Sequence, residues 1–98
     1  MGHDITGYKV SDTSHANGLA YLRRSAFSQF NGAIYQALDA EACNGELSGL
    51  GVERTFTVEQ LRAALARLPQ DDNHDRERFF LETCINNSDG EAVEITFY

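Results

Sequence analysis

The final eight residues of the chain, Glu-Ala-Val-Glu-Ile-Thr-Phe-Tyr (91–98), constrain the fold more than any other stretch. Apolar and polar residues alternate through them with a period of two, which is typical of a strand with one buried face. The inward set is Val93, Ile95 and Phe97, and the outward set is Glu94, Thr96 and Tyr98. Such a strand needs neighbouring strands at its sides and a layer of helices over its apolar face. The rest of the chain must therefore supply both.

A second strand is predicted near the start of the chain, over residues 4–10, which are rich in β-forming residues. Its alternation is imperfect, because Ile5 is out of phase with Tyr8 and Val10. A β-bulge at Gly7 would reconcile the two phases.

Residues 19–25 allow two interpretations. After the polar, turn-rich loop 11–18, they can form a strand that pairs back on residues 4–10 as a hairpin. They can also begin the helix that follows. We favour a strand for part of this stretch.

A first helix is predicted over residues 26–43, where apolar residues recur at helical spacing. Its apolar face consists of Phe27, Phe30, Ile34, Ala37 and Leu38. Asn44 and Gly45 are expected to end this helix, because both residue types tolerate the left-handed conformation found at helix ends. Residues 46–56 are then predicted to form a loop.

The stretch Phe-Thr-Val-Glu-Gln-Leu that starts at Phe56 carries the clearest local signal in the chain, a capping box at the start of a second helix. Thr57 can accept a hydrogen bond from the helix start, and Gln60 can reach back to Thr57. Phe56 and Leu61 occupy the two positions of a hydrophobic staple. Pro69 is expected to end the helix. The predicted buried stripe is Leu61, Leu65 and Leu68.

A third helix is predicted to begin at a cap formed by Asp72 or Asn73. Asp75 and Glu77 lie in its first turn, where the positive end of the helix dipole favours acidic side chains. Its apolar face is predicted to contain Phe80, Leu81, Cys84 and Ile85.

The stretch Asn-Asn-Ser-Asp-Gly (86–90) is interpreted as a helix stop and a turn. A calcium loop with Gly90 at its sixth position would place Ile85 and Thr96 at the two anchoring positions, and neither carries a carboxylate. The glycosylation sequon at Asn86 is set aside, because the N-terminal stretch lacks the pattern of a secretory signal.

These elements predict an α+β fold in a single small soluble domain over residues 1–98. The sheet is expected to be small and antiparallel, with about three strands that include the N- and C-terminal ones, and about three helices between the terminal strands. Cys43 and Cys84 lie in apolar contexts and are expected to be reduced core residues, which favours a cytoplasmic protein. No stretch approaches the length of a membrane span.

The charge of the chain is strongly uneven. The net charge is −7, and residues 71–98 hold eight acidic residues against two arginines. Such a surface repels nucleic acid and anionic membranes, and it suits a basic protein partner. The candidate binding residues on this basis are Asp71, Asp72, Asp75, Glu91 and Glu94. The adjacent pair Arg23 and Arg24 is expected to face solvent or to meet these acids.

An alternative candidate is an anion site, because the glycine-rich stretch 45–57 leads into a helix N-terminus. Its residues would be Gly49, Gly51, Arg54 and Thr57. No metal site is predicted, since the three histidines lack the spacing that places two imidazole rings on one helical face and no Cys-x-x-Cys pair is present. No cofactor is predicted.

For function, the sequence favours a non-enzymatic protein-interaction or regulatory module. A small-ligand or anion binder that uses the 45–57 stretch is the alternative, and an enzyme is less favoured. A structural or mimic role, such as an acidic decoy for a nucleic-acid-binding protein, is the least favoured class. A homodimer and a monomer are both left open. The homodimer interface would be the 91–98 strand, as a sheet edge, or a surface bearing Tyr8, Tyr21, Tyr35 and Tyr98.

Overall fold

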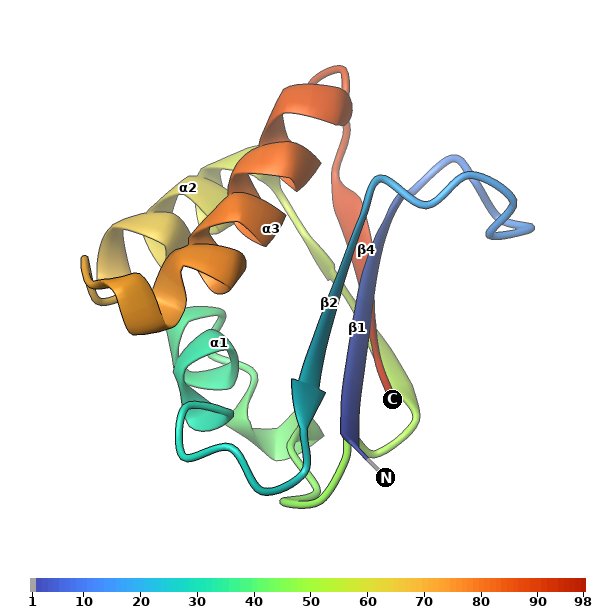
Figure 1. The fold of residues 1–98 in the computed structure, drawn as a ribbon. Helices are drawn as coiled ribbons and strands as arrows, with labels where there is room; N and C mark the ends of the chain where they lie inside the picture. The colour runs from blue at the N-terminus through green and yellow to red at the C-terminus, as the bar shows by residue number, and fades with distance from the viewer. Residues whose placement is uncertain (1) are drawn as a thin grey trace.

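The computed structural model describes residues 2–98, and within them it has an α+β fold with one antiparallel sheet of four strands and three helices (Figure 1). The strands are β1 (Gly2–Lys9), β2 (Ala20–Ser25), β3 (Val52–Phe56) and β4 (Val93–Phe97). The helices are α1 (Gly32–Ala37), α2 (Val58–Arg67) and α3 (Asp75–Asn87), with single 3₁₀ turns at Glu41–Cys43 and Asp72–His74. The predicted fold class is confirmed, with one strand more than expected.

The two terminal strands lie in the middle of the sheet, whose strand order is β2-β1-β4-β3. Tyr8 of β1 faces Glu94 of β4, and Val93 of β4 faces Phe56 of β3. The predicted pairing of the last strand with the first is confirmed, but the alternative that the last strand forms an edge is wrong. In the described part of the chain, the edges of the sheet are β2 and β3.

The helices cover one face of the sheet, and the other face is open (Figure 1). The side chains of Val93, Ile95 and Phe97 are fully buried against the helices, as their alternation predicted. Tyr8 and Glu94, which face each other across β1 and β4, lie on the open face. An antiparallel sheet with one face against the core and one face toward solvent is a common arrangement.

Gly7 does not form the predicted bulge. Pairing runs without a break through Gly7, which faces Ala20 on one side and Ile95 on the other. Gly7 points toward the helices, and a Cβ atom there would lie 2.6 Å from Cys84 Sγ. The glycine therefore allows α3 to approach β1 closely. Tyr8 is out of phase with Ile5 because it lies on the open face of the sheet, and Val10 lies beyond the end of the strand and is exposed.

The predicted helix over 26–43 is mostly wrong, because only Gly32–Ala37 is α-helical. Ser25 and Ser28 accept hydrogen bonds from backbone amides two residues ahead, and this local bonding competes with a helix. Asp39 then adopts φ 54°, which ends α1 well before Asn44. Ile34, Ala37 and Leu38 are buried as predicted, but Phe27 is 82% exposed.

The predicted loop over 46–56 contains β3, which the sequence did not reveal. Three of its five residues, Glu53, Arg54 and Thr55, are polar and exposed, so the apolar signal of a half-buried strand is missing. Short, charged strands are typical of sheet edges. Within residues 19–25, Ala20–Ser25 form the strand β2 and pair with β1 as a hairpin, so the favoured interpretation is confirmed.

The start of α2 is confirmed. Gln60 N–H donates to Thr57 Oγ1 at 3.1 Å, and Thr57 N–H donates to Gln60 Oε1 at 2.7 Å. The third helix starts slightly differently from the prediction, because Asp71 caps the 3₁₀ turn that precedes Asp75. After α3, Asp89 and Gly90 have positive φ angles, as the predicted turn requires.

Both cysteines, Cys43 and Cys84, are free and buried, as predicted. Among residues 2–98, no helix is long and apolar enough to cross a membrane.

Candidate functional site

A groove of about 740 Å³ lies between the edge strand β2 and the helix α3. Its apolar lining is Leu19, Ala20, Leu22, Phe79 and Phe80. Its charged rim is Asp75, Arg76, Arg78 and Glu82, all from α3. Most small-ligand and peptide sites combine an apolar floor with a few polar groups in this way.

The main chain of β2 offers hydrogen-bonding groups that point away from β1. Tyr98 N–H donates to Asp4 O at 2.9 Å, so Asp4 directs its main-chain groups toward β4. Its partner in β2, Arg23, therefore directs its N–H and C=O outward, and Tyr21, two residues earlier, does the same. Arg76 donates to Arg23 O and covers that part of the edge. The outward N–H and C=O of Tyr21 remain available beside the groove.

A buried ion pair fixes α3 against β2. Arg24 Nε and Nη2 donate to the two carboxylate oxygens of Glu77 at 3.0 and 2.6 Å. Arg24 Nη2 also donates to Asn73 O at 2.7 Å. The Glu77 side chain is 0% exposed and that of Arg24 is 13% exposed. This bidentate pair sets the separation of the two elements that form the groove. It also confirms that Arg24 meets the acidic C-terminal third.

Phe79 stands out on the groove wall, because 71% of it is exposed whereas its neighbour Phe80 is buried. A single exposed apolar residue is common at a protein surface. Here the exposed ring adjoins the apolar floor of the groove and the unpaired main-chain groups of Tyr21 in the edge strand β2. A bound segment could cover all three together.

The acidic residues that the sequence singled out do not form one surface. Asp71, Asp72 and Asp75 lie at the start of α3, whereas Glu91 follows its end, and thirteen helical residues span about 20 Å. Glu94 lies on the open face of the sheet, on the side opposite the helices.

Two of these acids are engaged locally. Asp71 Oδ1 lies 2.6 Å from His74 Nδ1, and this hydrogen bond holds the pKa of Asp71 below its usual value. Asp75 forms an ion pair with Arg78.

The residues of the predicted anion site are also separated. Gly51 precedes β3 and Thr57 follows it, so about 20 Å of extended strand lies between them at ~3.3 Å per residue. Gly49 packs on the end of β4, where a Cβ atom would lie 2.4 Å from the carbonyl carbon of Phe97. Arg54 Nη1 donates to Asp39 O at 3.1 Å. Gly49 therefore allows close packing at the end of β4 and Gly51 lies just before β3. The N-terminus of α2 is capped by the side chain of Thr57.

The four tyrosines do not share one surface either. Tyr35 is fully buried, and its hydroxyl is hydrogen-bonded to His3 Nδ1 at 2.7 Å. Tyr8 stacks on His15 on the open face, the exposed Tyr21 donates its hydroxyl to Asp4, and the exposed Tyr98 lies just beyond β4. A dimer through a tyrosine-bearing face stays a prediction.

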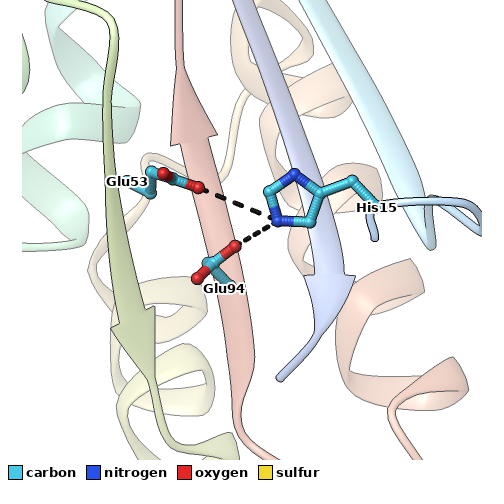
Figure 2. Close-up of side chains that lie close together, drawn as sticks. All are labelled: His15, Glu53 and Glu94. Atoms are coloured by element: carbon cyan, nitrogen blue, oxygen red, sulfur yellow. Dashed lines mark hydrogen bonds and ion pairs between the residues drawn. The ribbon is translucent and has the colours of Figure 1, made fainter. Parts of the chain in front are cut away.

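A second cluster lies on the open face of the sheet, where His15, Glu53 and Glu94 meet (Figure 2). His15 Nε2 contacts Glu94 Oε1 directly and lies 3.8 Å from Glu53 Oε2. The ring of Tyr8 stacks on the imidazole at 4.2 Å with an interplanar angle of 13°. Sequence reasoning missed the grouping, because it depends on the sheet register that places β3 beside β4 and on the path of the β1–β2 loop.

Comparisons of the chain with models of protein families, with curated proteins and with solved structures give no match.

Proposed function

We propose that the protein is a non-enzymatic interaction module that binds an extended segment of a protein partner in the groove between β2 and α3. The observation that carries this proposal is the outward N–H and C=O of Tyr21 on the edge strand β2, which lie beside an apolar floor. An extended segment would add a fifth strand at Tyr21, with main-chain hydrogen bonds that supply affinity and side-chain contacts that supply specificity.

The chemistry of the groove favours a segment that is apolar and basic. Its apolar side chains would pack on Phe79 and on the floor below it. The rim holds two acidic and two basic side chains, of which Asp75 and Arg78 pair with each other and Arg76 donates to Arg23 O. Glu82 can pair with a cation, and the net charge of −7 attracts basic segments over longer distances. A second copy of this chain carries the same charge and is the less favoured occupant.

The test begins with a library of random peptides displayed on phage and selected on the immobilised protein at low salt. The proposal expects selected peptides to alternate apolar and basic residues. Their affinity, measured by fluorescence anisotropy, should fall as salt rises, because the pairing is partly electrostatic. A selection that enriches no such peptide, or only acidic ones, would contradict the proposal. So would a concentration-dependent dimer, in sedimentation, that competes with the peptide.

Two matched pairs of variants locate the binding site. Tyr21→Pro removes the outward N–H without touching the bonds to β1, and Tyr21→Ala removes the same side chain but keeps the N–H. Only the proline variant should lose peptide binding. Phe79→Ala should weaken binding about tenfold or more, as for an aromatic hot spot. Phe27→Ala removes a ring that is even more exposed and does not line the groove, and it should change the affinity less than about twofold.

We also propose a cytoplasmic location. The two free, buried thiols support it, because reduced cysteines are usual in reducing compartments. Fractionation of the source cells with an antibody to the native protein would test this, and recovery outside the cytoplasm would contradict it.

A further inference from the structure

We propose that His15, Glu53 and Glu94 form a binding site for a divalent transition-metal ion of the Zn²⁺ class. One ligand atom from each residue lies within 4.8 Å of the other two, and the three come from the β1–β2 loop, β3 and β4. The site lies on the open face of the sheet, separate from the groove between β2 and α3.

The distances suit a shared cation. Zn²⁺ binds imidazole nitrogen and carboxylate oxygen at about 2.0–2.2 Å, so two ligand atoms in a tetrahedral site lie about 3.4 Å apart. His15 Nε2 and Glu53 Oε2 are already 3.8 Å apart. Nε2 and Glu94 Oε1 are closer, since they form a direct hydrogen bond, and a cation would replace the proton between them. A rotation of the Glu94 carboxylate would lengthen the distance between Nε2 and Oε1 to the spacing that two ligands of one cation require.

The sheet register holds the two carboxylates in place. Glu94 faces Thr55 of β3, so Glu53, two residues earlier on the same strand, is its diagonal neighbour on the same face. Two carboxylates with a neutral imidazole carry charge −2, which a divalent cation balances. Their side chains are 29% and 45% exposed, which leaves room for water at the remaining coordination position.

The loop presents His15 in a defined orientation. The carboxylate of Asp12 accepts hydrogen bonds from Ala16 N–H at 3.1 Å and Asn17 N–H at 2.9 Å, immediately after His15. His15 itself has φ 54°, a conformation uncommon outside glycine. The stacked ring of Tyr8 then holds the imidazole parallel to itself above β4. Fixed ligand orientation of this kind raises metal affinity.

The test uses the untagged full chain and metal salts alone. Calorimetric titration with Zn²⁺ should give one ion per chain, and the visible absorption of bound Co²⁺ should show nitrogen and oxygen ligation without thiolate bands. His15→Asn and Glu53→Gln should each lower the Zn²⁺ affinity at least about tenfold. Glu53→Gln is the sharper variant, because Glu53 is exposed and lies beyond hydrogen-bond distance of His15, so the folded state should tolerate its loss.

His74→Asn is the matched control, since His74 contacts a single carboxylate, that of Asp71. It should leave the Zn²⁺ affinity within about twofold of the unchanged chain. The proposal is overturned if Zn²⁺ does not bind at micromolar concentration. It is equally overturned if the affinity is unchanged in both His15→Asn and Glu53→Gln, or if His74→Asn lowers the affinity as much as they do.

Discussion

Replacing Glu77 by Gln should destabilise the fold more than any other single polar substitution at the interface between β2 and α3. Glu77 is fully buried, and its two carboxylate oxygens accept both donors of the Arg24 fork. Glutamine offers one oxygen acceptor, and its NH₂ group meets the other donor of Arg24. The guanidinium, 13% exposed, is then left without a counter-charge.

The expected loss is about 3–5 kcal/mol in the free energy of unfolding, because removal of one partner leaves an uncompensated buried charge. Domains of this size have stabilities of about 5–15 kcal/mol, so a loss of this size removes a large part of the stability and brings a domain at the low end of the range close to unfolding. Urea denaturation followed by far-UV circular dichroism measures the loss directly.

The neighbouring pair of Arg23 and Asp4 provides the control. Its side chains are 52% and 36% exposed and are screened by solvent, so Arg23→Gln should lower the free energy of unfolding far less than Glu77→Gln does. The double variant Arg24→Met/Glu77→Leu should recover most of the stability, since an apolar pair of similar volume often replaces a buried ion pair without loss. A loss below about 1 kcal/mol for Glu77→Gln would refute the view that this pair clamps α3 to β2.

Three further predictions concern the core and the helix start. Gly7→Ala should cost about 1–3 kcal/mol in urea denaturation because its Cβ would lie 2.6 Å from Cys84 Sγ, whereas Gly18→Ala, with 3.4 Å to its nearest neighbour, should be nearly neutral. Thr57→Ala should lower the free energy of unfolding by ~1 kcal/mol, and an unchanged midpoint would contradict the capping role. Burial raises the pKa of Cys84 to about 12, so the folded thiol keeps its proton when the unfolded thiol has lost it. Stability should therefore fall by up to about 1.4 kcal/mol per pH unit from pH ~8.5 upward, and Cys84→Ala should show a shallower fall.

The sequence predicted those parts of the fold whose signals are local. The alternation in 91–98 and the capping box at Thr57 each depend on neighbours within a few residues, and both are confirmed. The strand β3 was missed because an exposed edge strand lacks an apolar face, and its pairing with β4 is a contact between distant segments. The helix predicted over 26–43 was too long, because the prediction relied on the helical spacing of its apolar residues. It did not take into account the hydrogen bonds that the side chains of Ser25 and Ser28 accept from nearby backbone amides.

The candidate sites were harder to predict, because each is assembled from distant segments. The groove requires the pairing of Arg24 with Glu77, 53 residues apart in the chain. The cluster on the open face joins His15 to Glu94, 79 residues apart. Glu94 was selected from the sequence for its charge, but its partners could be found only from the sheet register.

Amide hydrogen exchange at Tyr21, measured by NMR with and without a selected peptide, tests the central claim most directly. The Tyr21 amide should exchange rapidly in the free protein, because it points away from β1, and it should become protected when a segment adds to the edge of β2. The amides of Leu22 and Arg24, which bond to β1, should be protected in both states. The claim is contradicted if the peptide binds and the Tyr21 amide exchanges at an unchanged rate while amides of β3 or the open face become protected.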